Sequence, residues 1–105
     1  MSAVSKTKEC AIEARLVKAV ALFGGVTVKM QSAPRGFPDR LVLLPGGKVI
    51  FTEVKRPKGG RVSPHQRDWM ARLRQCGARA VVVRNAADID KILWARTASS
   101  SGDEG

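Results

Sequence analysis

Apolar residues near the N-terminus repeat at helical spacing. Between residues 7 and 23 they recur every three or four positions, at Ile12, Leu16, Ala19, Val20 and Phe23. This spacing places them on one face of a helix. Thr7 suits the cap position, and the pair of glycines at 24–25 suits the end of the helix.

The middle of the chain predicts three short strands, at residues 27–31, 40–44 and 48–55. A loop containing two prolines and a glycine, residues 32–38, separates the first two strands. Pro-Gly-Gly at 45–47 predicts a hairpin turn between the second and third. These two strands should therefore pair in an antiparallel manner.

The second half of the chain predicts helix, strand and helix. Ser63 and Pro64 form a favoured pair for starting a helix. The inward stripe of this helix consists of Gln66, Trp69, Met70 and Leu73. It should end before Gly77, and a buried strand at 79–84 and a helix at 87–96 should follow.

The order of elements predicts one domain over residues 7–96. Helix, three strands, helix, strand and helix, with an antiparallel hairpin in the middle, indicate a mixed β-sheet flanked by helices. We therefore expect an α/β fold, in the wide sense that includes α+β, with the order αβββαβα. Residues 1–6 and 97–105 should be flexible termini, since the latter are rich in Ser and Gly.

The charge of the chain indicates a polyanionic partner. Nineteen Lys and Arg face nine Asp and Glu, which gives a net charge of +10. Nucleic acid is the first partner to expect for such an excess. No apolar run is long enough to span a membrane, and the first ten residues lack the apolar stretch of a signal peptide. We expect no membrane partner and a cytoplasmic location.

Five residues of types that often serve in binding or catalysis are expected to have no such role in this chain. Cys10 and Cys76 have no metal-ligating neighbours at zinc-site spacing, so we expect two reduced, partly buried thiols. His65 should be an exposed helix residue. Trp69 and Trp94 are expected in the core rather than as platforms for stacking bases.

Charged residues occupy unusual positions at the ends of apolar strands. Asp39 precedes one strand, and Glu53 and Lys55 end the next. Strand residues two apart share a face, so Glu53 and Lys55 point the same way. Val49 and Phe51 lie on that face too. It should therefore be core at one end and a charged site at the other.

The length of the hairpin turn decides whether Asp39 joins this site. A two-residue loop would place Asp39 opposite Val54, on the wrong face. A three-residue loop pairs Leu44 with Lys48 and places Asp39 opposite Glu53. Such loops commonly end in a left-handed glycine, which this turn supplies. We predict the three-residue loop.

Two carboxylates at one point repel each other and favour a bound cation. Mg²⁺ or Mn²⁺ is the natural choice for oxygen ligands. Such an ion activates water and neutralises phosphate charge, and an adjacent lysine stabilises the transition state of phosphodiester hydrolysis. Taken singly, Asp39 also fits a turn former, and Glu53 and Lys55 also fit an exposed strand end.

Several motifs together carry a family resemblance. Pro-Asp at 38–39 and Glu-x-Lys at 53–55 resemble the signature of the restriction-endonuclease-like superfamily. Further motifs appear in order: Glu-x-x-Leu at 13–16, Gly-Gly at 24–25, Leu-Pro-Gly-Gly at 44–47, Ser-Pro-x-Gln at 63–66 and Gly-Ala at 77–78. The series covers about residues 9–93 and is similar to the VRR-NUC family, the virus-type replication-repair nucleases.

The resemblance implies a metal site. It assigns Asp39 and Glu53 as ligands of Mg²⁺ or Mn²⁺, with the backbone carbonyl of Val54 as a third oxygen. Glu13 matches the acidic residue of the first helix and is a further candidate ligand. Glu9 lies one turn earlier on nearly the same face and remains an alternative to Glu13.

The resemblance also implies the remaining catalytic residues. Lys55 matches the catalytic lysine, and Gln66 matches a glutamine at the start of the later helix. At that helix N-terminus, the Gln66 amide could reach a phosphate or a water. Basic residues near the site in sequence are expected to contact DNA phosphates: Arg35, Arg56, Lys58 and Arg61.

These observations favour a metal-dependent endonuclease that acts on branched DNA. A domain this small has little room for a separate module that reads sequence. Small members of the similar family resemble Holliday-junction resolvases, so we expect a homodimer with two active sites. Two alternatives stay open: a monomeric nuclease for flaps or single-strand junctions, and a non-catalytic DNA-binding protein of the same fold.

Overall fold

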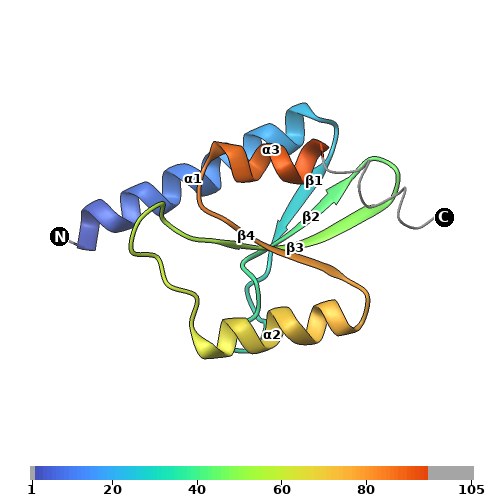
Figure 1. The fold of residues 1–105 in the computed structure, drawn as a ribbon. Helices are drawn as coiled ribbons and strands as arrows, with labels where there is room; N and C mark the ends of the chain where they lie inside the picture. The colour runs from blue at the N-terminus through green and yellow to red at the C-terminus, as the bar shows by residue number, and fades with distance from the viewer. Residues whose placement is uncertain (1, 95–105) are drawn as a thin grey trace.

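The computed structural model describes residues 2–94, which form three layers (Figure 1). A four-stranded sheet lies between two helices on one side and a single helix on the other. The elements are α1 (Ser2–Leu22), β1 (Val26–Lys29), β2 (Arg40–Leu44), β3 (Lys48–Val54), α2 (Pro64–Gln75), β4 (Arg79–Val83) and α3 (Ala86–Trp94). The expected order of elements is confirmed.

The sheet is mixed, as the sequence predicts. Its strands lie in the order β1-β2-β3-β4. The first three strands pair in an antiparallel manner, and β3 and β4 run parallel. The parallel pair requires a crossover, which α2 provides on one face of the sheet. The C-terminal ends of β3 and β4 therefore lie at the same end of the sheet.

The hairpin between β2 and β3 has the predicted three-residue loop. Leu44 pairs with Lys48, and Arg40 pairs with Thr52. Gly46 and Gly47 both adopt positive φ angles, 89° and 79°, which glycine adopts without steric cost. One step beyond the last of these pairs, Asp39 stands opposite Glu53. The register needed for a shared site is confirmed.

The hydrophobic core lies between the sheet and the layer of α1 and α3. Leu16 and Val20 of α1 are fully buried there, and Ile89 and Ile92 of α3 pack beside them. The sheet contributes Val42, Leu44, Ile50, Val54 and Val83. Fully burying one such side chain stabilises a fold by about 1.5–3 kcal/mol. Val54, which directly follows Glu53 in β3, belongs to this core. The core therefore holds this end of β3 in place.

The prediction that Val49 and Phe51 lie in the core, on the face of β3 that carries Glu53, is only partly confirmed. Val49 was expected in the core, but 45% of it is exposed. Phe51 is half-buried and packs edge-on against Phe37, with ring centroids 5.6 Å apart. Helix α2 covers this face and packs mainly on β4. The turn end of β3 therefore remains open to solvent.

Some predicted boundaries also need correction. Helix α1 begins at Ser2, so residues 2–6 are helical rather than a loose start, and Thr7 is not the cap. The apolar stripe does not extend into this first segment, so the pattern gave no signal for it. Strand β1 ends at Lys29 rather than residue 31, and α3 begins at Ala86. The expected flexible tail, 97–105, lies outside the described residues.

The cysteines and aromatic residues give a mixed outcome. Cys10 and Cys76 are free, as expected, but both are exposed rather than partly buried. Trp69 is half-buried against Phe37. The prediction that Trp94 lies in the core is wrong, because 62% of this residue is exposed. It lies at the end of α3, and its ring packs edge-on against Phe23 with the ring centroids 5.0 Å apart.

Two further expectations concern surfaces. His65 is exposed on the first turn of α2, as predicted. Within residues 2–94, no helix is both long and apolar enough to cross a membrane.

Candidate active site

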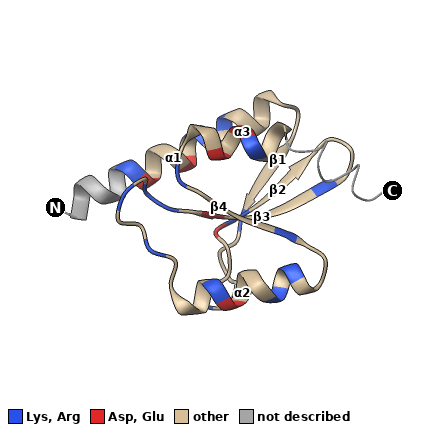
Figure 2. Cartoon of the chain, in the orientation of Figure 1, with Lys and Arg blue, Asp and Glu red and all other residues tan. Residues whose placement is uncertain are grey.

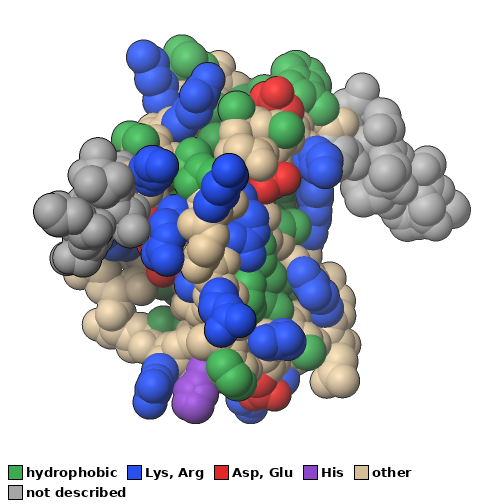
Figure 3. Space-filling view, turned by 60° about the vertical axis from the view of Figure 1, so that its left-hand side comes forward, with side chains coloured by type: hydrophobic (Ala, Val, Ile, Leu, Met, Phe, Trp, Pro, Cys, Tyr) green, Lys and Arg blue, Asp and Glu red, His purple; other side chains and the backbone are tan. Residues whose placement is uncertain are grey.

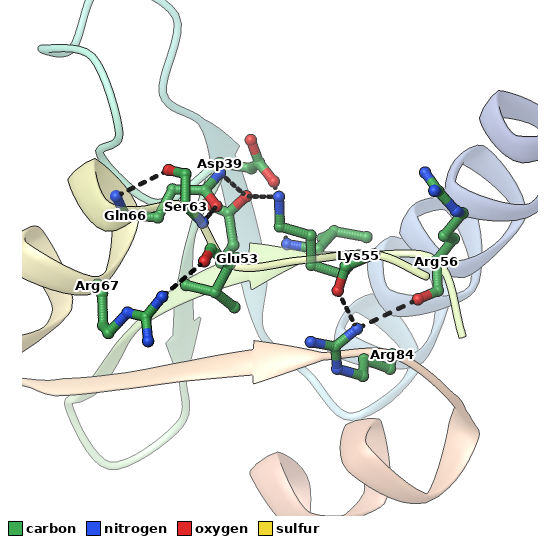
Figure 4. A network of polar contacts seen from close by, with 11 residues as sticks. Asp39, Glu53, Lys55, Arg56, Ser63, Gln66, Arg67 and Arg84 are labelled. Carbon is green, nitrogen blue, oxygen red and sulfur yellow. Dashed lines mark hydrogen bonds and ion pairs between the residues drawn. The ribbon is translucent and has the colours of Figure 1, made fainter. Parts of the chain in front are cut away.

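The predicted charged site forms where β2 begins and β3 ends (Figure 4). Asp39 lies just before β2 and accepts a hydrogen bond from the backbone N–H of Val54 at Oδ2, over 3.0 Å. This bond continues the pairing of the two strands by one step. It holds the Asp39 carboxylate beside the last residues of β3. Asp39 is therefore positioned by backbone geometry rather than by a flexible loop.

Glu53 is the most deeply buried charged group of the site. Only 3% of the residue is exposed. Its Oε2 atom accepts a hydrogen bond of 2.7 Å from Nε2 of Gln66 and lies 3.6 Å from Nζ of Lys55. Its other oxygen, Oε1, is buried and has no hydrogen-bond partner among the described residues. A buried oxygen without a partner costs free energy unless a proton shared with Asp39 or a bound cation satisfies it.

Lys55 points toward Glu53, as their spacing along the strand predicts. The backbone N–H of Lys55 donates to the carbonyl of Val83 over 3.0 Å, which fixes the main chain just past the end of β3. Its side chain is 15% exposed. The ammonium group thus reaches the carboxylates from the solvent side, where a substrate could meet it.

Gln66 is fixed by the start of α2. The Ser63 hydroxyl accepts from the backbone N–H of Gln66, and the backbone N–H of Ser63 donates to Oε1 of Gln66 over 2.9 Å. This capping box satisfies two N–H groups at the start of α2 that have no partner within the helix. It also turns Nε2 of Gln66 toward Glu53. Gln66 therefore positions Glu53, rather than reaching freely toward a phosphate.

The environment of Glu53 raises its pKa from 4.5 to about 8. Burial is the largest cause, and the nearby negative charge of Asp39 is the second. The ammonium of Lys55 lowers the pKa, but by less than the other two raise it. Without a cation in the site, Glu53 therefore holds a proton at neutral pH.

This shift predicts that the metal-free protein loses stability as the pH rises. Folded Glu53 binds its proton more tightly than the unfolded chain does, so its stabilising contribution is complete below pH 4.5 and lost as the pH passes about 8. A loss of a few kcal/mol between pH 5 and 9 is expected from a shift of this size. Urea unfolding with a chelator present measures it.

Glu53→Gln is expected to flatten this dependence, because glutamine does not titrate. Asp90→Asn, at an exposed position of α3, is the matched control and should keep the wild-type slope. Equal slopes in the wild type and Glu53→Gln would show that Glu53 is ionised in the folded protein across this range.

The residues present fit a hard divalent cation. Asp39 and Glu53 supply two carboxylates, and one buried oxygen of Glu53 has no hydrogen-bond partner in the described part of the chain. In an extended strand, the N–H and C=O of one residue point to the same edge, so the carbonyl of Val54 points to the edge where Asp39 lies. No group of three or more His, Cys, Asp and Glu side chains suited to a metal occurs within residues 2–94. Mg²⁺ suits such a site because it binds through one or two carboxylates and keeps several waters.

The structure does not gather Glu13 into this cluster. Oε2 of Glu13 accepts a hydrogen bond of 2.7 Å from Arg40 and lies 3.8 Å from Nζ of Lys29. Arg40 also donates to the hydroxyl of Thr27. Adjacent strand residues point to opposite faces, so Arg40 faces α1 while Asp39 faces away. Arg40 next to the Pro-Asp motif was the sequence signal for this ion pair, and it was missed.

Lys and Arg residues occur on helices, strands and loops of the fold (Figure 2). On the face shown in Figure 3, Lys and Arg side chains clearly outnumber Asp and Glu. Of the expected phosphate contacts, Arg35, Lys58 and Arg61 are exposed. Arg56 differs, because it is half-buried and donates to the carbonyls of Lys58 and Gly59 within its own loop. Arg56 therefore braces the loop.

Sequence reasoning missed Arg84 entirely. This residue follows β4, and its guanidinium donates to the carbonyls of Gly60 and Arg56 (Figure 4). Hydrogen bonds from Arg56 and Arg84 thus hold the loop at 56–62 in place. The available signal was a charged residue at the end of a buried strand, the same signal that identified Glu53 and Lys55.

The fold and this site define a VRR-NUC nuclease domain. The family model named "VRR-NUC domain" matches residues 2–87, and the chain belongs to this family. It is 44% identical over 87 residues to "Putative nuclease p44" of Acyrthosiphon pisum secondary endosymbiont phage 1, a match that covers 82% of this chain and 91% of that protein. It is also similar to a solved structure titled "VRR_NUC domain", with a TM-score of 0.75 and 32% identity, covering 82% of this chain and 94% of the other.

Proposed function

We propose that this protein is a Mg²⁺- or Mn²⁺-dependent DNA endonuclease that hydrolyses phosphodiester bonds in branched DNA. The observation that carries the proposal is the pairing of Asp39 with a buried Glu53, one oxygen of which has no hydrogen-bond partner within residues 2–94. Lys55 stands beside Glu53, where its ammonium can stabilise negative charge in the transition state. Membership of a nuclease family and a phage relative named as a nuclease support it.

In this proposal, each residue has a separate task. Asp39, Glu53 and the carbonyl of Val54 would hold the cation, which supplies water activation and charge neutralisation at the phosphate. The ammonium of Lys55 stabilises the negative charge that grows on the phosphoryl oxygens in the transition state. Gln66 keeps Glu53 in place through its hydrogen bond. Glu13 acts from outside this set, through its ion pair with Arg40.

The proposed substrate is DNA with the shape of a Holliday junction, cut by a homodimer. A net charge of +10 favours binding to phosphates regardless of base sequence. A two-fold dimer supplies two sites for two coordinated cuts. An uncovered apolar patch on the sheet face that carries α2 supports self-association, since Val26, Val28 and Val49 are exposed there. The phage origin of the relative supports a setting in the cytoplasm of a bacterial or phage-infected cell.

The test is incubation of the pure protein with flaps, forks and four-way junctions, with Mn²⁺ or with a chelator. We expect Mn²⁺-dependent cleavage, fastest on the four-way junction, and a solution mass of two chains. Preferential cleavage of flaps by a single chain would favour the monomeric alternative. Binding without cleavage of any substrate would leave only a DNA-binding protein of the same fold.

A further inference from the structure

A large groove lies beside the candidate active site, on the same face of the sheet. It has a volume of about 1070 Å³ and runs between the loop at 59–64, helix α2 and strand β4. Met70 and Val82 form part of its apolar lining. Val82 pairs in register with Glu53 on the neighbouring strand. The groove therefore begins one strand away from the buried carboxylate.

The charge of this groove is strongly one-sided. Its charged lining residues are four arginines, Arg61, Arg67, Arg74 and Arg84, and no Asp or Glu lines it. Within the part of the chain that the structure describes, none of these four forms an ion pair with a carboxylate. Four guanidinium groups along one hollow produce a positive potential that only an anion can offset.

Three of these arginines are held by neutral partners. Arg67 donates to the carbonyl of Val62, Arg74 to that of Ala80, and Arg84 to that of Gly60. Carbonyl acceptors orient a guanidinium without cancelling its charge. Each guanidinium also has five N–H donors, so most of them remain available to a ligand. Figure 4 shows Arg67 to the left of Glu53 and Arg84 below Lys55.

The wall of the groove is closely packed rather than loose. Gly60 is buried, and a Cβ atom there would lie 2.9 Å from the carbonyl oxygen of Arg56 and 3.1 Å from the Cβ of Lys55. The loop thus packs directly on the chain that follows β3. A preformed site loses less conformational entropy on binding than one that must fold around its ligand.

We infer that this groove holds the phosphodiester backbone of DNA that flanks the scissile bond. The inference rests on the proposed function for the identity of its ligand, and it adds Arg67, Arg74 and Arg84 to Arg61 as the DNA-binding surface. One strand of DNA carries a negative charge about every 3.4 Å, so a row of arginines can meet successive phosphates. Contacts of this kind fix the register of the strand without reading its sequence.

The test uses the double variant Arg61→Gln with Arg67→Gln and measures binding to a four-way junction in a chelator, so that no cleavage occurs. Fluorescence anisotropy at several salt concentrations gives the slope of log K against log salt. We expect weaker binding, on the order of tenfold, and a slope reduced by roughly 1.4 to 1.8. Arg61→Gln alone has no described hydrogen bond to lose, and should reduce the slope by roughly 0.7 to 0.9.

A matched control removes the same charge elsewhere. Arg15→Gln with Lys91→Gln changes two exposed residues of α1 and α3, on the opposite side of the sheet. Their effect on the slope should stay below about 0.5, because they make no direct phosphate contact. Equal effects of the two double variants would overturn the groove as the binding site. The groove variants could show the reduced salt dependence while the wild type cleaves no DNA in Mn²⁺. That result would refute the proposed nuclease activity but still support the groove as a DNA-binding site.

Discussion

Asp39→Asn is expected to lower the rate of Mn²⁺-dependent DNA cleavage by on the order of 10³-fold or more. Asparagine can still accept the hydrogen bond from the N–H of Val54, so the junction of β2 and β3 should persist. What the variant removes is one of the two negative charges that would hold the cation. Single-turnover cleavage of a labelled four-way junction measures the rate.

Two measurements accompany this variant. Its thermal unfolding should match that of the wild type, and its binding to DNA without metal should be at least as tight, since it carries one negative charge fewer. Asp90→Asn, on the exposed side of α3, loses the same charge and should cleave normally. If Asp39→Asn cleaved at the wild-type rate, Asp39 would have no part in the reaction.

Lys55→Ala is expected to reduce cleavage by roughly 10²–10³-fold, the usual effect of removing one group that stabilises transition-state charge. The loss should appear in the rate at saturating DNA, because Lys55 acts most strongly on the charge that develops during the reaction. The variant should still bind DNA, with a steep dependence on salt. Single-turnover rates at increasing protein concentration separate the two effects.

Lys91→Ala is the control for Lys55→Ala, because it removes an exposed lysine on the other side of the sheet. It should cleave at nearly the wild-type rate. An equal loss in both variants would mean that the effect comes from net charge. Unchanged cleavage in Lys55→Ala would exclude this lysine from the mechanism.

The core of the site could be predicted because it depends on local geometry. The turn between β2 and β3 sets the register, and the register places Asp39 opposite Glu53. The alternation of side chains along a strand then places Lys55 on the same face. These relations need no knowledge of how the helices pack.

Contacts between distant elements could not be predicted in the same way. The hydrogen bond from Gln66 to Glu53 depends on where α2 lies against the sheet, and no local pattern specifies that. The ion pair between Glu13 and Arg40 depends on the orientation of α1 in the same way. Sequence order alone therefore did not show that Arg40 holds the carboxylate of Glu13.

The arginine groove was missed for a related reason. Arg67, Arg74 and Arg84 come from α2 and the end of β4, and they meet only when the parallel strand pair brings these elements together. Nearness in sequence suggested Arg56 as a phosphate contact, but its guanidinium donates to carbonyls of its own loop, and Arg56 does not line the groove. Long-range packing, rather than composition, decides which basic residues face the site.

The proposed mechanism depends on one divalent cation that Asp39 and Glu53 share beside Lys55. Crystals soaked in Mn²⁺ and measured by anomalous scattering locate the ion directly. We expect one strong peak within bonding distance of both carboxylates and of the carbonyl of Val54. Mn²⁺ bound elsewhere on the chain, with no peak between Asp39 and Glu53, would contradict the account.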